Sequence, residues 1–299
     1  MSYKHKSRAG FTLVELLVSL VIISILAALS LSGLSAVRRR SREEATRTTI
    51  RKIHEIIVPQ YESYLDKRLD RASCITIGGS APSSVVGTRR RFEWGKLVTI
   101  RKTLAFEMPD NWGDVGGVVP SGYQTGRTNA YAAHSGASSV SHGSAECLYM
   151  ICLLSGFQPE AMENFRAEEI GDKDGDGKPE FHDAWGMPIA FIRWPTGFNG
   201  PITLNQLTND PFDPETVDSS RPPQTGGPAS ISYGVVPLIY SAGLDQEYGL
   251  ADAQASGVQP DVDVGDFNIV TATSGGHFAS SLLGNASQDN ISNHDLITR

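Results

Sequence analysis

The sequence predicts an α+β protein in which a long N-terminal helix packs on a small antiparallel β-sheet with large loop insertions. Residues 11–37 form an apolar run of 27 residues that contains a single carboxylate. Isoleucines then recur at helical spacing, so the helix is expected to continue through residues 38–72 as an amphipathic half. Beyond residue 183, β-rich runs bounded by turn residues predict short strands.

The first ten residues form a basic leader. They contain Lys4, Lys6 and Arg8 and no acid, and they end at Gly10 directly before the apolar run. A basic segment before an apolar run is typical of an export signal. At about 1.5 Å per residue, a helix over 11–37 is long enough to cross a hydrocarbon core of about 30 Å. We therefore expect a transmembrane helix, since the run is long for a cleaved secretory peptide.

Glu15 is the one charged residue of this run. A carboxylate inside a bilayer costs on the order of 3 kcal/mol or more, so it is expected to find a cationic partner. The alternative is that Glu15 lies at the headgroup level and stays hydrated, which its position near the start of the helix permits.

The amphipathic half of the helix carries an apolar stripe. Ile50, Ile53, Ile56 and Ile57 recur at helical spacing with charged residues between them. Pro59 is expected to kink the helix, with helical character resuming up to residue 72. The stripe needs a partner surface to cover it.

The segment that follows mixes loops with short apolar pieces. Gly78–Gly87 and Ser135–Ser144 are rich in glycine and serine and predict loops, with a short apolar piece over Leu97–Phe106 between them. Ala145–Leu154 is expected to be a short apolar helix, and Ala161–Ile170 a second, acidic helix.

An acidic motif after this second helix has the spacing of a calcium loop. Oxygen-bearing side chains occupy positions 1, 3, 5, 9 and 12, a glycine occupies the sixth position, and the seventh residue would offer its carbonyl. The predicted ligands are Asp172, Asp174, Asp176, Lys178, Glu180 and Asp183. Clustered carboxylates repel one another unless a hard cation neutralises them, so this spacing favours Ca²⁺.

Two residues depart from an ordinary EF-hand loop. Position 12 is Asp183 where a bidentate glutamate is usual, and Pro179 removes a backbone donor. A strand-like run follows the loop, where an EF-hand has a helix. We therefore predict a single isolated calcium loop, and the alternative is a solvated acidic turn.

The N-terminal string Gly10-Phe11-Thr12-Leu13-Val14-Glu15 resembles the prepilin processing motif shared by type IV pilins and the pseudopilins of type II secretion systems. The resemblance implies that a prepilin peptidase cuts after Gly10 and methylates the amine of Phe11. It also implies that Glu15 of one subunit neutralises that amine on its neighbour, so that subunits assemble through their first helices. The implied fold is pilin-like.

Three later stretches resemble landmarks of the type II secretion major pseudopilin, in the same order. They are Asp183 to Pro188, Tyr240 to Asp245 and Asp289 to His294. In that family the loop after the second landmark binds calcium through a backbone carbonyl and nearby carboxylates. The matched candidates for a second ion are the Ala242 carbonyl and Asp245.

The net charge of −7 divides unevenly along the chain. Residues 1–72 contain 13 Lys and Arg against 7 Asp and Glu, a net of +6, and residues 73–299 carry a net of −13. The acidic head argues against a nucleic-acid partner. The odd number of cysteines, Cys74, Cys147 and Cys152, argues against a disulfide scaffold, and we interpret them as packing residues.

These features predict a non-enzymatic filament subunit with a leader (1–10), a membrane and assembly helix (11–37), an amphipathic helix (38–72) and a globular head (73–299). We expect it to be stored in the cytoplasmic membrane with the head outside the cytoplasm, and then to assemble into a periplasmic or extracellular filament. Its expected partners are the membrane, other copies of the chain, related subunits, the prepilin peptidase and the inner-membrane assembly machinery. The alternatives are a membrane-anchored, calcium-dependent exported enzyme and a minor or adhesive tip pilin. No catalytic motif of a metalloprotease, hydrolase or phosphate-binding loop supports the enzyme.

Overall fold

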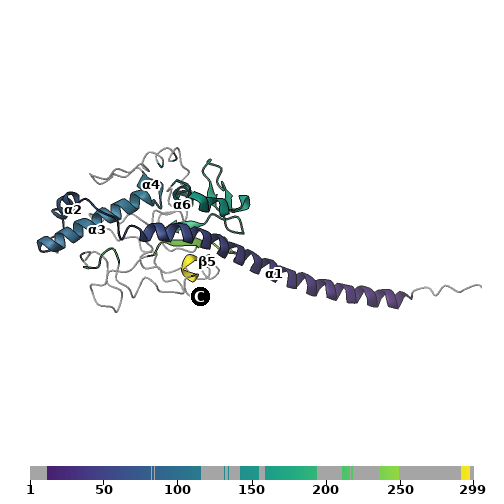
Figure 1. Cartoon of the computed structure of the whole chain (residues 1–299). Coiled ribbons are helices and arrows are strands. Elements are labelled where there is room, and N and C mark those ends of the chain that lie inside the picture. The colour runs from purple at the N-terminus through teal and green to yellow at the C-terminus, as the bar shows by residue number, and fades with distance from the viewer. Residues whose placement is uncertain are drawn as a thin grey trace, which may run out of the picture. The chain divides into compact units, whose positions relative to one another are not determined.

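The structure, a computed structural model, is α+β and divides into two compact units, residues 1–44 and residues 45–299. Its long N-terminal helix, shorter helices and small antiparallel sheets appear in Figure 1. The described residues are 12–81, 83, 85–115, 131, 134, 142–154, 159–193, 211–215, 217, 236–248 and 291–296, without the side chains of 29–33, 159, 161 and 295.

Helix α1 runs from Leu13 to Glu62 and contributes to both units. In the second unit its isoleucine stripe enters the main hydrophobic core, and each stripe residue is at most 1% exposed. The residues are Ile50, Ile53, Ile56 and Ile57. Burial of four such side chains is worth roughly 1.5–3 kcal/mol each before the entropy cost of folding, so the head is built on this half of the helix.

Helix α1 ends earlier than the sequence predicted. Helical character was expected up to residue 72, but the helix stops at Glu62 and turns follow over residues 63–66. A new helix, α2 (Arg71–Gly78), begins where the Asp70 carboxylate accepts hydrogen bonds from the Ser73 N–H (2.8 Å) and hydroxyl (2.7 Å). This side-chain cap starts a separate helix.

Helix α3 (Thr88–Glu107) contains the short apolar piece predicted over residues 97–106 and is longer than that piece by more than two turns. Its buried residues include Trp94, Leu97, Val98 and Leu104. Helices α2 and α3 pack so closely that a Cβ at Gly95 would lie only 2.0 Å from the Cys74 carbonyl oxygen. Only glycine, which has no side chain, permits this close approach.

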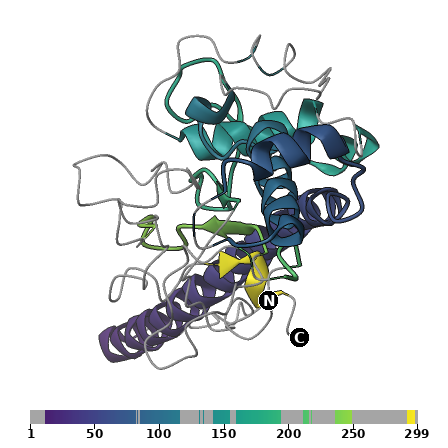
Figure 2. The same cartoon turned by 90° about the vertical axis from the view of Figure 1, so that its left-hand side faces the viewer.

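A three-stranded antiparallel sheet has the order β3-β4-β5. The strands are β3 (Ala190–Ile192), β4 (Leu238–Ser241) and β5 (Ile291–Ser292), and Figure 2 shows the yellow β5 beside the green β4. Phe191, Ile239 and Ile291 join the isoleucine stripe in the main core. Their neighbours along the strands form a second cluster on the other face, so this small sheet is buried on both sides.

Asn293 joins the C-terminal segment to both the sheet and helix α1. It lies in the short helix η5 (Asn293–Asp295) and is fully buried. Its side-chain oxygen accepts from the Ile239 N–H (2.8 Å), and its amide donates to the Pro237 carbonyl (2.9 Å) and lies 3.1 Å from His54 Nδ1. One amide thus satisfies backbone groups beside β4 and contacts the long helix.

A hairpin and helix α6 complete the described part of the head. Strands β1 (Ile170–Gly171) and β2 (Glu180–Phe181) pair antiparallel, and α6 (Gly143–Leu154) packs on β2 and β3. Helix α4 (Trp112–Val115) lies next to α6. The acidic helix predicted over 161–170 is instead two 3-10 helices, η1 (Pro159–Asn164) and η2 (Ala167–Glu169).

Glu169 links this hairpin to helix α1. Its carboxylate accepts from the Thr49 hydroxyl (2.6 Å), from Lys52 Nζ (2.9 Å to each oxygen) and from the Arg166 N–H (2.7 Å). Burial opposes ionisation, but these donors outweigh it and lower the pKa of Glu169. The ionised carboxylate is therefore the form that holds the helix and the hairpin together.

Replacing Glu169 by glutamine is expected to destabilise the head by about 2 kcal/mol at neutral pH, because the mutation removes a charged hydrogen-bond acceptor. A carboxyl group with a lowered folded pKa stabilises the protein above its unfolded pKa, and this stability is lost as the pH falls through the folded pKa. The wild-type melting midpoint should therefore fall more steeply on acidification than that of E169Q. Glu160→Gln, at an exposed site, is the matched control, and equal pH profiles for E169Q and wild type would contradict the assignment.

Candidate functional site

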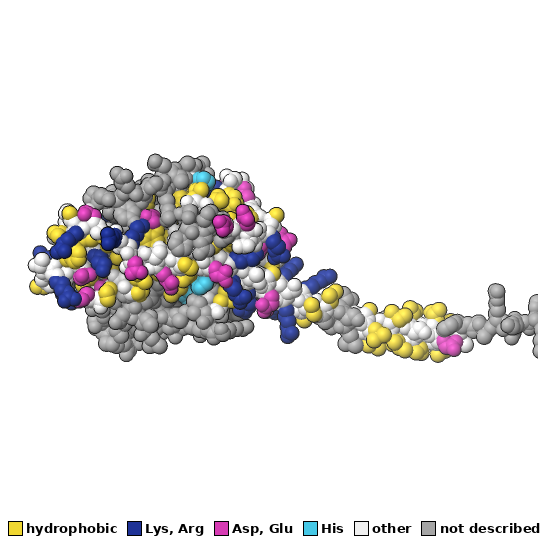
Figure 3. Space-filling model, in the orientation of Figure 1, with side chains coloured by type: hydrophobic (Ala, Val, Ile, Leu, Met, Phe, Trp, Pro, Cys, Tyr) yellow, Lys and Arg dark blue, Asp and Glu magenta, His cyan; other side chains and the backbone are white. Residues whose placement is uncertain are grey.

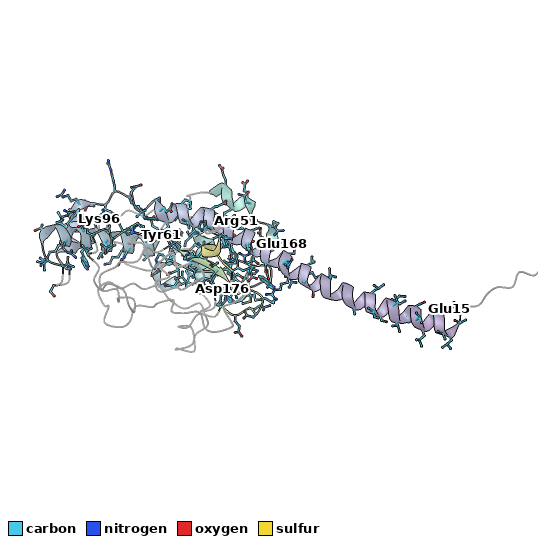
Figure 4. All side chains as sticks on the ribbon, turned by 90° about the horizontal axis from the view of Figure 1, so that it is seen from below. Glu15, Arg51, Tyr61, Lys96, Glu168 and Asp176 are labelled. Carbon is cyan, nitrogen blue, oxygen red and sulfur yellow. The ribbon has the colours of Figure 1, made fainter. Side chains whose placement is uncertain are left out.

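The predicted processing residues, Gly10 and Phe11, lie outside the described residues. The description begins at Thr12, and Glu15 lies in the first turn of α1, at the end labelled in Figure 4. Glu15 Oε2 accepts from the Thr12 N–H and hydroxyl, both at 2.9 Å, and the Glu15 N–H donates to the Thr12 hydroxyl at 3.3 Å. This reciprocal pattern is a capping box, which the sequence analysis missed although its T-x-x-E spacing was visible.

The described residues of the first unit expose many large apolar side chains. They lie between Leu13 (81% exposed) and Leu26 (58%) and again at Leu34 and Val37 (63%), and Figure 3 shows yellow side chains along this part of α1. Exposed apolar surfaces of this size mark sites of interaction with proteins or membranes.

The predicted membrane segment, 11–37, is described only in part, because residue 11 and the side chains of 29–33 lie outside the description. Within the described residues, no helix combines the length and the apolar character required to span a membrane.

The acidic loop connects β1 to β2. The Asp172 carboxylate accepts from the Gly175 N–H (2.7 Å) and the Gly177 N–H (2.9 Å), and Asp176 Oδ1 accepts from the Lys178 N–H (2.9 Å). Gly175 and Gly177 have φ values of +78° and +90°, which favour glycine. The sequence thus folds into a tight turn that keeps its carboxylates on one side of the hairpin. Figure 4 labels Asp176 in this loop.

The carboxylates gather into two groups that share Asp174. Ligand atoms of Asp172, Asp174 and Glu180 lie within 4.8 Å of one another, and so do those of Glu146, Asp174 and Asp176. Glu146 belongs to α6 and was not among the predicted ligands. No spacing rule could have found it, because its loop partners lie about thirty positions away in the sequence.

Burial changes the acidity of Glu146. It raises the pKa of Glu146 to about 8, and the nearby carboxylates Asp174 and Asp176 act in the same direction. A hydrogen bond from Trp112 Nε1 and the charge of Lys178 oppose this rise. In the absence of a cation, burial and like charges therefore both disfavour the ionised carboxylate.

The side chains of two predicted ligand residues make other contacts. Lys178 places its ammonium 4.0 Å from the Trp112 ring centroid and 4.0 Å from Glu146 Oε2, while its carbonyl stays a predicted ligand. Asp183 accepts from the Trp185 N–H (2.8 Å), the Met187 N–H (2.9 Å) and the Ser241 hydroxyl (2.6 Å). Asp183 is therefore a turn-forming residue, and it belongs to neither carboxylate group.

The candidates for a second ion lie after β4. Ala242 is buried, and Asp245 lies in an exposed turn, where its Oδ1 accepts from the Glu247 N–H at 2.9 Å. Neither residue belongs to a carboxylate group within the described ranges, and the segment after residue 248 lies outside them. A second ion here stays a prediction.

All three cysteines are buried and free. Burial raises the pKa of the thiols of Cys74, Cys147 and Cys152. A thiol with a raised pKa is a poor nucleophile and metal ligand at neutral pH, which supports their interpretation as packing residues.

Residues 5–31 match the family model of the prokaryotic N-terminal methylation motif. This motif is the prepilin-type signal of type IV pilins and pseudopilins, and it contains the Gly10 to Glu15 string. Searches of curated proteins and of solved structures found no match. The chain therefore carries a prepilin-type signal, followed by an α+β head.

Replacing Ser241 by alanine is expected to destabilise the head by about 1–3 kcal/mol, because buried Asp183 loses one of its three donors. The same contact joins the turn before β3 to the end of β4, so the melting midpoint of the full-length protein should fall. Ser80→Ala, in an exposed turn, is the control. If S241A melts at the wild-type temperature, Asp183 does not depend on this hydroxyl.

Proposed function

We propose that the chain is a structural subunit of a type IV pilus-like filament or type II secretion pseudopilus. The carrying observation is the prepilin-type signal at residues 5–31, which leads directly into an exposed apolar helix. In this proposal, the prepilin peptidase cuts after Gly10 and methylates Phe11. The protein is a single-pass protein of the cytoplasmic membrane before assembly, with its head outside the cytoplasm.

The contrast between the two halves of α1 supports assembly through the first half. The stripe at Ile50 to Ile57 is buried in the core of the head, whereas the described large aliphatic residues between Leu13 and Val37 are exposed. In the membrane these side chains contact lipid, and in a filament they contact the same half-helix of neighbouring subunits. Transfer between the two environments costs little, because both are apolar.

Glu15 gives the assembly its register. Cleavage before Phe11 creates a cationic amine four residues from this carboxylate, within the same apolar region. In the isolated chain the Glu15 side chain bonds Thr12, which is a neutral partner. The amine of a neighbouring subunit adds an opposite charge in a poorly hydrated setting, so the pair favours one axial position of the incoming subunit.

The contact between two landmarks favours a pseudopilin-like head. Asp183 and Ser241, which belong to the first and second matched stretches, form a direct hydrogen bond of 2.6 Å. Asn293, in the third stretch, bonds the backbone beside β4. The three stretches thus act as one structural unit around the sheet. No catalytic role is assigned to the chain.

Replacing Gly10 by valine should leave an unprocessed precursor, because a β-branched side chain hinders the scissile bond. Mass measurement of the purified protein should find the intact leader in G10V and an N-terminal methylated Phe11 in the wild type. Ser7→Val, in the same leader, is the control and should be processed. Normal cleavage of G10V would contradict the proposal.

Replacing Glu15 by glutamine separates the helix cap from the charge. Glutamine can still accept from Thr12, so α1 keeps its first turn, but it cannot neutralise a cationic amine. E15Q should therefore be processed and membrane-bound, yet fall at least tenfold in sheared filaments. Glu55→Gln, in the exposed part of the amphipathic half, should assemble normally. Wild-type amounts of E15Q filaments would rule out this role for the charge.

A further inference from the structure

Five carboxylates converge at the hairpin loop from two separate elements. Asp172, Asp174, Asp176 and Glu180 come from the hairpin, and Glu146 comes from helix α6. They form two overlapping groups, each within 4.8 Å, and Asp174 belongs to both. Like charges this close repel one another strongly, so the arrangement needs a compensating positive charge.

Two of the five carboxylates are buried with an oxygen left without a partner. Glu180 is 0% exposed and Glu146 is 1% exposed, and among the described residues no donor bonds Oε1 of either one. The second oxygen of Glu180 accepts only weakly, from the Lys173 N–H at 3.1 Å, and lies 3.5 Å from His182 Nε2. An orphan carboxylate oxygen in a protein interior is costly, and buried charges are ordinarily paired or bound to a metal.

Lys178 neutralises Glu146 only weakly. Lys178 Nζ lies 4.0 Å from Glu146 Oε2, at the outer limit of an ion pair, and is also positioned over the Trp112 ring. Glu146 Oε2 also accepts a hydrogen bond from Trp112 Nε1. The other oxygen of Glu146, Oε1, is therefore available to bind a cation.

We propose that the hairpin loop and Glu146 together bind one Ca²⁺ ion. Asp172, Asp174, Asp176 and Glu180 supply the loop ligands, and Glu146 supplies the carboxylate from outside the loop. An ordinary calcium loop takes its last carboxylate from its own twelfth position, but here Asp183 accepts hydrogen bonds from Ser241 and two backbone N–H groups. Glu146 therefore replaces Asp183 in the ligand set.

The ligand set favours Ca²⁺ over Mg²⁺. Ca²⁺ accepts about six to eight oxygens at about 2.3–2.6 Å in a flexible geometry, which suits several carboxylates gathered from a loop and a helix. Mg²⁺ requires a tighter octahedron at about 2.1 Å and keeps its water. All the proposed ligands are hard oxygens, which excludes a preference for a soft thiophilic metal.

The proposal does not depend on filament assembly and can be tested on the full-length protein in detergent. After removal of metals with EDTA, titration calorimetry with CaCl₂ should give one site per chain, with MgCl₂ binding at least tenfold more weakly. Ca²⁺ should also raise the melting midpoint, because the ion binds the folded site.

Two variants locate the site. Asp174→Asn, at the residue shared by both groups, should abolish binding. Glu146→Gln should weaken the Kd for Ca²⁺ at least tenfold, whereas Glu163→Gln, an exposed glutamate, should not change it. Circular dichroism of each variant without Ca²⁺ checks folding, and Glu146→Asp, which keeps the charge, tests the same position if E146Q unfolds. E146D should also bind more weakly, because its carboxylate is one methylene shorter.

Terbium provides an independent test of position. Tb³⁺ replaces Ca²⁺ in oxygen sites, and its emission is sensitised by a nearby indole. Excitation of tryptophan should give strong Tb³⁺ emission that Ca²⁺ displaces, and Trp112→Phe should remove most of it. Absence of Ca²⁺ binding by the wild type would overturn the proposal, as would unchanged Ca²⁺ affinity in folded E146Q.

Discussion

The buried isoleucine stripe of helix α1 is the constraint on which the rest of the head depends. Ile50, Ile53 and Ile57 are fully excluded from solvent, and the inward residues of all three strands of the sheet pack in the same cluster. A sheet of two- to four-residue strands is too small to be stable alone. The helix supplies the surface that such a sheet lacks, and polar contacts from Glu169 and Asn293 fix its position against the hairpin and the sheet.

In its first half, the same helix leaves its apolar side chains exposed. No core covers the residues between Leu13 and Val37 that are described as exposed, and the two halves belong to separate compact units. The exposed first half is thereby left available for lipid and for neighbouring subunits in the proposed filament. In that proposal, one continuous helix serves both storage in a membrane and assembly.

Local patterns in the sequence were sufficient for some elements and not for others. Three features were predictable because each depends on a pattern within a short stretch of sequence. They are the isoleucine stripe, the apolar helix over 145–154 and the acidic loop. Only the apolar second half of helix α3 was noted in the sequence, because the charged first turn and Gly95 interrupt the apolar pattern, whereas close packing on α2 is what requires the glycine. Asp183 fits position 12 of a calcium loop by spacing, yet its hydrogen bond to Ser241, 58 residues away, gives it a structural role.

The position of the acidic hairpin explains why an ion would matter to the whole head. At one end, Glu169 directly precedes β1 and joins it to Thr49 and Lys52 of helix α1. At the other end, Asp183 joins the segment after β2 to Ser241 of β4. The hairpin is thus attached to the rest of the head on two sides.

Helix α6 packs on β2 and forms a third side of attachment. On this third side Glu146 faces Asp174 and Asp176, and these carboxylates repel one another when they are ionised without a cation. Binding of Ca²⁺ would convert that repulsion into a cross-link between α6 and the hairpin. The resulting stabilisation lies within the head and requires no change in the apolar half of α1.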